Sequence, residues 1–252
     1  MSETNAIVKG KIIRFFPNFD EKAKSFYKVK LKDGREGILP VTETLTNIEN
    51  SYTGLAQDFL GKEFIFKIIS KEPLTLSQTE AVAQEINNMN VGDIITAKVL
   101  DIDGGDGVVL EKDGIPMYLP KSEACHLDNP LLTKMFESGQ IIKVQIIDMS
   151  NGRITVTHKP FTKITREYIE ENYAPNTYTI GEVTYIIKNS GIETYFVNIE
   201  PGIDVACRLS AFTKEQRKRL LNQIKIGTEV TIKISNLNKE ATKISGMIID
   251  TV

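Results

Sequence analysis

The sequence contains few of the residues from which catalytic and metal-binding sites are usually built. Among its 252 residues there are two cysteines, two histidines and no tryptophan. The cysteines, Cys125 and Cys207, have no partner at disulfide or metal-ligand spacing, which is typical of a reducing compartment. The histidines, His126 and His158, stand in neither a zinc-ligand nor a nucleophile–base arrangement. We therefore expect a protein that is not an enzyme and that holds no metal or cofactor.

Long apolar runs and a large excess of charge of one sign are also absent. No segment approaches the roughly 18 consecutive apolar residues that a membrane span requires, and MSETNAIVKG at the start lacks the apolar stretch of a secretory signal. These absences predict a cytoplasmic protein with no membrane partner. The 31 basic residues face 33 acidic ones, for a net charge of −2, so binding to nucleic acid would have to come from local patches.

One short phrase occurs twice, about eighty residues apart. The chain reads DGREGILP at 33–40 and DGIPMYLP at 113–120. Repetition at a fixed spacing indicates a copied structural unit, and this period fits about three units into the chain. A more distant third copy, EPGIDVACRLS at 200–210, keeps the turn but has Cys207 and Arg208 in place of Leu-Pro.

Segments that alternate between apolar and polar residues, as half-buried strands do, follow one another in each unit. In the second unit they are DIITAKVLDI, GVVLEK, the repeated phrase, QIIKVQIIDM and GRITVTHK. The longest other segment of each unit lies between the third and fourth strands. In the third unit it is TKEQRKRLLNQI at 213–224, where Leu220, Leu221 and Ile224 form an apolar stripe and predict a short helix.

Five strands with a helix between the third and fourth is the plan of the OB-fold, a small Greek-key barrel. Closure suits units of this size, because a closed barrel leaves no unprotected strand edge. The sequence therefore predicts an all-β chain of three tandem five-stranded OB-fold barrels, with short helices between strands 3 and 4 and in the linkers. The predicted domains are residues 1–80, 88–159 and 177–252, and a helix is predicted in each of the linker segments 78–90 and 160–176.

The three units resemble the S1 RNA-binding domain, a repeat that the longest protein of the small ribosomal subunit carries in several copies. The likeness rests on DGIPMYLPKSE, IIKVQIIDM and GRITVTHK in the second unit, on YFVNIEPGIDVACRLS and IGTEVTIKI in the third, and on DGREGILPVTE in the first. It covers most of the chain as three consecutive, divergent copies. The resemblance implies binding of single-stranded RNA on the outer face of the barrel, where family members usually present aromatic residues on the second strand and a His on the third.

In the third unit the resemblance places Phe196 on the second-strand aromatic position and Arg208 on the His position. Strand parity agrees, because Tyr195 and Val197 share the apolar face while Phe196 points the other way. An exposed Phe beside an Arg can hold a base by stacking and its phosphate by charge.

The second unit departs from the family pattern. Alignment puts its second-strand position at Gly107 or Val108, neither of which is aromatic, and Pro120 replaces the His. We therefore expect the second unit to have lost its stacking platform. Arg153 and Lys243 occupy the family's basic position at the start of the last strand in the second and third units, and are predicted to be auxiliary contacts.

The first unit offers a basic face. If Val29 and Leu31 point into the barrel, the residues between them share the outer face. These predicted nucleic-acid contacts are Phe26, Lys28, Lys30 and Lys32, with Arg35 just past the turn. Phe15, Phe16 and Phe19 lie at the end of the first strand and in the loop after it, where at least one could join this face.

Each of these residues also has a structural interpretation. Alternating lysines are just as typical of a solvated strand face that discourages edge pairing. Phe196 would serve equally to pack against a neighbouring unit, and Tyr185 is more typical of a core or domain contact. The basic residues on the helix at 213–224 are commonly solubilising.

Two functions follow from these patterns. The first is a non-catalytic single-stranded RNA-binding protein whose first and third units contact the strand while the second spaces them, with single-stranded DNA as an alternative ligand. The second is a structural or protein-interaction module that has kept the barrels and lost RNA binding, such as an accessory subunit of a ribosomal, polymerase or phage assembly. The missing platform of the second unit and the slight net acidity favour this alternative.

Overall fold

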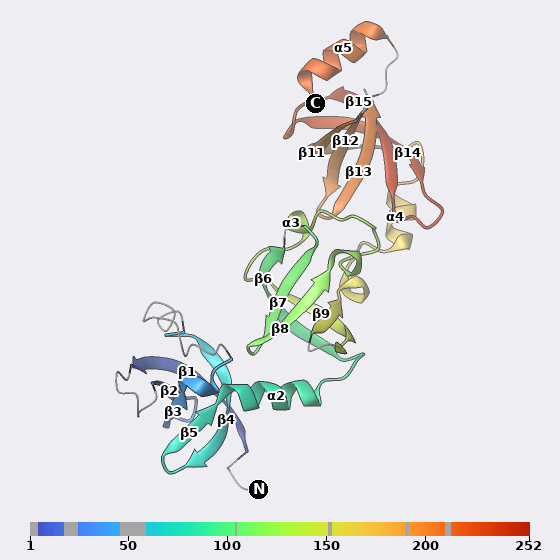
Figure 1. Ribbon diagram of the computed structural model, residues 1–252. Helices are drawn as coiled ribbons and strands as arrows, with labels where there is room; N and C mark the ends of the chain where they lie inside the picture. Colours follow the sequence, from blue (N-terminus) through green and yellow to red (C-terminus); the bar gives the residue numbers. More distant parts are fainter. Residues whose placement is uncertain are drawn as a thin grey trace. The chain divides into compact units, whose positions relative to one another are not determined.

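The computed structural model describes residues 5–17, 25–45, 59–103, 105–150, 153–189, 192–209 and 213–252. The described strands form three closed five-stranded barrels, one after another along the chain (Figure 1). The chain divides into two compact units, Met1–Asn90 with Lys112–Ile115 and Val91–Glu111 with Pro116–Val252. None of the described helices has the length and apolar character that crossing a membrane requires.

The first barrel has the strand order β1-β2-β3-β5-β4. Its strands are β1 (Ile7–Phe16), β2 (Phe26–Leu31), β3 (Glu36–Pro40), β4 (Glu63–Lys71) and β5 (Leu74–Ser77), and a 3-10 helix, η1 (Val41–Glu43), follows β3. Residues 46–58, which lie before β4, fall outside the described residues. Helix α2 (Gln78–Asn88) begins directly after β5, because the Ser77 hydroxyl accepts a hydrogen bond from the Glu80 amide at 3.0 Å and caps the helix.

The second and third barrels repeat this plan. The second consists of β6 (Ile94–Asp103), β7 (Gly107–Lys112), β8 (Ile115–Pro120), β9 (Ile141–Asp148) and β10 (Ile154–Thr157), with η2 (Lys121–Glu123) and α3 (Leu132–Met135) between β8 and β9. The third consists of β11 (Tyr178–Asn189), β12 (Ile192–Glu200), β13 (Ile203–Leu209), β14 (Glu229–Leu237) and β15 (Ile244–Thr251), with α5 (Lys214–Gln223) between β13 and β14. In each barrel the third strand pairs with the fifth in parallel, which closes the cylinder.

The predicted fold class, three tandem OB-fold barrels with short helices, is confirmed. The linker helices are α2 and α4 (Arg166–Asn172), with a 3-10 turn, η4 (Lys159–Phe161), ahead of α4. The predicted apolar stripe of α5 is wrong in one position: Leu220 and Ile224 are buried, whereas Leu221 is 40% exposed. The domain limits 1–80, 88–159 and 177–252 stay a prediction.

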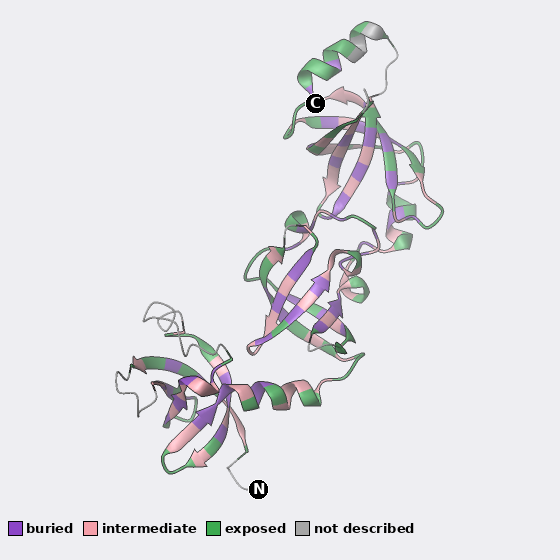
Figure 2. Cartoon of the chain, viewed as in Figure 1, coloured by how far each residue is buried: buried purple, intermediate pink, exposed green. Residues whose placement is uncertain are grey.

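Alternation along the strands decides which residues form the barrel interiors. In β2, Tyr27, Val29 and Leu31 are buried, and the lysines between them face outward. Figure 2 shows this alternation of buried and more exposed positions along the strands of all three barrels. Burying an aliphatic side chain of this size stabilises the fold by about 1.5–3 kcal/mol, so a one-residue slip of register would be strongly opposed.

The first strand of every barrel carries a bulge at the same place. The register shifts between Ile12 and Arg14 in β1, and in the same way between Val99 and Asp101 in β6 and between Val183 and Tyr185 in β11. The extra residue has no partner on the second strand, so the inward–outward alternation restarts beyond it. In β1 the consequence is that Ile12 is buried while Arg14 and Phe16 share the outer side.

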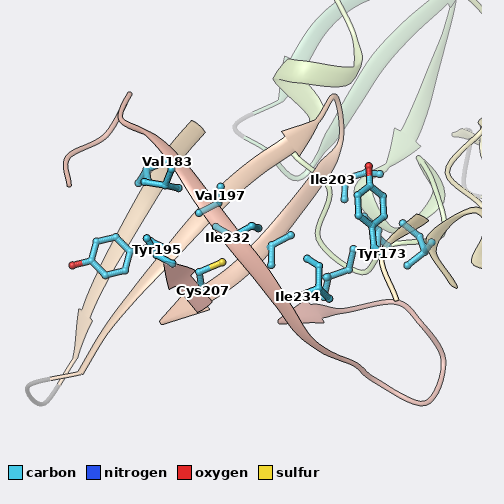
Figure 3. Packing of buried hydrophobic residues seen from close by; sticks show 14 of the residues in the cluster. Tyr173, Val183, Tyr195, Val197, Ile203, Cys207, Ile232 and Ile234 are labelled. Carbon is cyan, nitrogen blue, oxygen red and sulfur yellow. The ribbon is translucent and has the colours of Figure 1, made fainter. Parts of the chain in front are cut away.

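One hydrophobic cluster joins the interior of the third barrel to the linker and to the connection between β8 and β9 of the second barrel. The cluster contains the interior of the third barrel, Cys125 and Leu127 of the second barrel, and Ile164, Ile169 and Tyr173 of the linker. Figure 3 shows Tyr173 and Tyr195 toward opposite ends of this cluster. The linker and the third barrel therefore contact the second barrel through Cys125 and Leu127.

A partly buried carboxylate fixes the linker to the third barrel. Glu200, at the end of β12, accepts hydrogen bonds from the Tyr168 hydroxyl (2.6 Å), the Tyr173 hydroxyl and Lys163 Nζ (2.6 Å). Burial opposes ionisation of Glu200, but these three donors outweigh it and hold its pKa below the usual value of 4.5. The hydrogen bonds therefore stabilise the ionised form.

Replacement of this carboxylate tests its contribution to stability. We expect Glu200→Gln to lower the free energy of unfolding of the compact unit that holds the second and third barrels by about 1.5–3 kcal/mol. This is the usual range for hydrogen bonds to a charged group. Because the folded-state pKa is lowered, the stabilisation is present above pH 4.5 and is lost as the pH falls through the folded-state value, so the difference from wild type should shrink in acid. Urea denaturation followed by circular dichroism at pH 7 and pH 3 measures it.

Glu170→Gln is the matched control, because Glu170 pairs with Arg166 on the exposed side of the same linker helix. This variant should unfold as wild type does. An equal effect of the two substitutions at pH 7 would contradict the assigned role of Glu200.

Candidate nucleic-acid interface

The outer side of β1 and β2 in the first barrel gathers aromatic and basic residues. Strand pairing sets Arg14 opposite Lys28 and Phe16 opposite Phe26. Lys30 stands two residues beyond Lys28 on the same side. The five residues Arg14, Phe16, Phe26, Lys28 and Lys30 are called the first-barrel face below.

An aromatic stack lies at one end of the first-barrel face. The rings of Phe16 and Phe26 are 4.9 Å apart between centroids and inclined by only 16°. The guanidinium of Arg14 lies 4.7 Å above the Phe16 ring. Phe15 points the other way and packs on Tyr27 in the core, while Phe19 lies outside the described residues. The bulge in β1 therefore determines which phenylalanine joins the face.

Carboxylates partly neutralise the cations predicted in this region. Lys28 Nζ lies 2.5 Å from a Glu36 carboxylate oxygen. Lys32 is 3.9 Å from Glu63, and Arg35 is 2.8 Å from Asp33, both beyond the face. Their side chains are largely solvated, so each pair is weak and open to competition by a phosphate. Lys30 makes no ion pair with any described residue, and it lies opposite Lys11 of β1.

Side-chain hydrogen bonds and charge keep these carboxylates ionised. The hydrogen bond from Lys28 and its charge lower the pKa of Glu36, and those from Arg35 lower the pKa of Asp33. Lys28 therefore faces a permanent negative charge at neutral pH. A nucleic acid that uses Lys28 has to displace that carboxylate.

The second barrel has acidic residues where the first has basic and aromatic ones. Asp101 and Asp103 take the places of Arg14 and Phe16 beyond the bulge, opposite Val109 and Gly107. The predicted alignment is corrected here, because Val108 faces inward and is fully buried. Two carboxylates on this side would repel a phosphate backbone.

An aromatic residue is nevertheless present on the outer side of the second barrel, on β8 instead of β7. Tyr118 lies over Gly107, where a Cβ atom would stand 2.4 Å from the tyrosine ring. The guanidinium of Arg153 stacks on Tyr118, 3.9 Å from the ring centroid. Sequence reasoning placed Arg153 but missed Tyr118, which the repeat aligns with an apolar Ile38 in DGREGILP.

The third barrel presents a pair of aromatic rings on its outer side. Phe196 of β12 is half-buried and lies opposite Tyr185 of β11, with ring centroids 6.1 Å apart and planes at 45°. Tyr185 is 58% exposed, so of its two interpretations, a core residue or a domain contact, the first is wrong. Arg208 is exposed on β13 two residues beyond Ala206, the partner of Phe196, and therefore shares the outer side diagonally.

A groove of about 540 Å³ separates the second and third barrels within their common unit. It is called the inter-barrel groove below. The third barrel contributes Tyr185, Phe196 and Asp204, and the second contributes Lys121, Leu131 and Lys134 from the connection between β8 and β9. Phe196 thus lines a groove beside the second barrel, and its role in stacking on a base stays a prediction.

Lys243 pairs with a residue of the second barrel. Its ammonium lies 3.3 Å from Asp128 of the second barrel, at a contact where the Asp128 amide donates to the Thr242 carbonyl at 3.1 Å. The structure therefore gathers Phe26, Lys28 and Lys30 on one face, and Phe196 and Arg208 on another. The other predicted contacts belong to neither group, and each has a partner of its own: Lys32, Arg35, Arg153 and Lys243.

Comparison with known proteins gives relatives for most of the chain. The ribosomal protein bS1 of Streptococcus pneumoniae R6 is 23% identical over 84% of this chain and 54% of its own length. The chain thus spans about half the length of that relative. A 4-hydroxy-3-methylbut-2-enyl diphosphate reductase of Clostridium acetobutylicum is 22% identical over 79% of this chain, but over only 33% of the reductase.

Among solved structures, a multidomain protein with nucleic acid binding domains from Streptococcus pneumoniae TIGR4 aligns with 99% of this chain and 75% of its own. It is 15% identical to this chain, and the TM-score of the superposition is 0.22. No protein-family model matches the sequence.

Three observations agree with the resemblance to the S1 domain. The repeated phrase occupies the same turn and third strand in the first two barrels, each barrel has the OB-fold strand order, and bS1 is similar along most of the chain. The chain consists of three tandem five-stranded OB-fold barrels, and most of its length is similar to bS1, as the resemblance to the S1 domain predicts.

Proposed function

We propose that the protein is a non-catalytic, cytoplasmic single-stranded RNA-binding protein whose first and third barrels contact RNA through their outer sides. The observation that carries the proposal is the first-barrel face, where the Phe16–Phe26 stack adjoins Arg14, Lys28 and Lys30. The second barrel, with Asp101 and Asp103 on the corresponding side, mainly spaces the other two.

The chemistry of the first-barrel face fits a single strand. Unpaired bases stack on aromatic rings with about 1–3 kcal/mol per base, and lysines at alternate strand positions follow the phosphates. Stacking does not depend on the 2′-hydroxyl, so single-stranded DNA should compete with RNA at this face. The similarity to bS1, a protein named for the small ribosomal subunit, supports a role near the ribosome.

The remaining contacts are weaker and act together. Tethering of two modest sites raises the effective concentration of the second, so micromolar affinity does not need a tight single site. The proposed contacts are Phe26, Lys28, Lys30, Lys32 and Arg35 in the first barrel, Arg153 in the second, and Phe196, Arg208 and Lys243 in the third.

Removal of stacking and charge from the first-barrel face should weaken RNA binding. We expect Phe26→Ala to reduce affinity by roughly 5- to 100-fold, since one stacked base is lost. Lys28→Ala with Lys30→Ala should also reduce the slope of log K against log salt by about 1.4, for two phosphate contacts on a single strand. Fluorescence anisotropy with a labelled oligouridylate at several salt concentrations measures both effects.

Lys71→Ala, in the hairpin between β4 and β5 away from this face, is the control and should bind as wild type. If wild-type protein binds no RNA at low salt, or if the three substitutions together leave binding unchanged, the proposal fails. The interpretation as a structural or protein-interaction module would then be favoured, and a protein that co-purifies after nuclease treatment would support it.

A substitution that strengthens binding separates the proposal from a general loss of structure. Glu36→Gln removes the carboxylate that competes for Lys28, so RNA affinity should rise by about 2- to 5-fold, the effect of one exposed ion pair. The same anisotropy titration at low salt measures this gain. Unchanged or weaker binding would show that Lys28 does not contact the phosphates.

A further inference from the structure

The inter-barrel groove contains a polar group that base stacking alone does not require. Asp204 of β13 lines the groove, and its outward position is diagonal to Phe196 because Asn198 pairs with Asp204 and Phe196 with Ala206. The aromatic ring and the carboxylate therefore stand on the same side of the same two strands. Tyr185 completes this wall from β11.

The carboxylate of Asp204 is only partly satisfied. Oδ1 accepts a hydrogen bond of 2.9 Å from the Asn198 side-chain amide, and no other described residue donates to Asp204. Burial raises the pKa of Asp204, against the lowering effects of Asn198 and of the charges of Lys121 and Lys134. A half-buried carboxylate with a free oxygen is stabilised by a ligand that brings hydrogen-bond donors.

The opposite wall of the groove is basic. Lys121 and Lys134 come from the second barrel, and Lys134 lies 3.6 Å from Glu182 of the third. The side chain of Glu182 is 46% exposed, whereas Asp204 is partly buried in the groove and hydrogen-bonded to Asn198, so Asp204 is the better-positioned acceptor for a ligand. The groove thus offers two aromatic rings, an acceptor and cations around one volume of about 540 Å³, which exceeds the size of a single nucleotide base.

The base that matches an acceptor of this kind is guanine. Its Watson–Crick edge presents two adjacent donors, N1–H and the N2 amino group, which a carboxylate can accept together. Adenine and cytosine each present one amino donor next to a ring-nitrogen acceptor, and uracil flanks its single N–H with two carbonyls. Each of these bases would place an acceptor against the negative carboxylate.

We propose that the inter-barrel groove binds a guanine base of single-stranded RNA, with Asp204 accepting from the Watson–Crick edge and Tyr185 and Phe196 contacting the ring. Lys121 and Lys134 face the adjoining phosphates. This inference rests on the proposed RNA-binding function and adds base selectivity to it. The selectivity comes from Asp204 in the third barrel, and the lysines of the second barrel add phosphate contacts that the third barrel alone lacks.

The test compares ten-nucleotide oligouridylates that differ at one central position, by anisotropy with the full chain. The oligomer with guanosine should bind about tenfold more tightly than those with adenosine, cytidine or uridine, the discrimination typical of a bidentate contact. Inosine, which lacks the N2 amino group, should lose most of this gain in the wild-type protein. 7-Deazaguanosine, which keeps the Watson–Crick edge, should retain it.

Variants assign the selectivity to the groove. Asp204→Asn should abolish the preference for guanosine while binding to oligouridylate persists, and Tyr185→Ala should weaken binding of the guanosine oligomer. Glu170→Gln, on the exposed side of α4, is the control and should keep the preference. Circular dichroism verifies that each variant is folded.

The outcomes separate this inference from the function on which it rests. Equal affinity for all four central bases, equal affinity for inosine and guanosine, or a preference that survives in Asp204→Asn would overturn the guanine site while RNA binding stands. Failure of every oligomer to bind would overturn both.

Discussion

The bulge in the first strand of each barrel is the constraint on which the candidate interface depends. A cylinder of five short strands closes only if its first strand coils strongly, and one unpaired residue provides the local bend. Because the bulge resets the inward–outward alternation, the same residue also decides which side chains beyond it face outward. In the first barrel those are Arg14 and Phe16, in the second Asp101 and Asp103, and in the third Tyr185 and Ile187. The three barrels thus share the bulge and differ in the side chains that it turns outward.

Charge is arranged locally in a chain whose net charge is nearly zero. Cations on the first barrel are paired with carboxylates that they themselves keep ionised, so the face is attractive to a phosphate only at contact distance. This arrangement favours weak, exchangeable binding of a phosphate over long-range electrostatic steering. The barrels also differ in surface chemistry, since the second barrel has acidic side chains where the first has basic and aromatic ones. The second barrel instead supplies lysines to the groove that it forms with the third.

Much of the fold followed from the sequence, because strand alternation and the repeated turn are local signals. Tyr27, Val29 and Leu31 are buried as the period-2 pattern of β2 requires, and the third-strand phrase lies where the repeat places it. The site was only partly predictable. The exposure of Tyr185, predicted to be a core or domain contact, follows from a bulge that inverts parity and leaves no mark in the local pattern. Of the two positions aligned with the second-strand aromatic, Gly107 and Val108, the second is buried in the barrel. Tyr118 and the groove depend on side chains of different strands or barrels, which no single-strand pattern can bring together.

The central claim is that a single strand of RNA lies against the outer sides of the first and third barrels. Photo-crosslinking of an oligomer containing 4-thiouridine, followed by mass spectrometry of the cross-linked peptides, tests this contact directly. The account predicts cross-links in peptides that carry Phe16 or Phe26 and in peptides that carry Tyr185 or Phe196. Cross-links confined to the second-barrel strands β6 and β7, where Asp101 and Asp103 face outward, would contradict it.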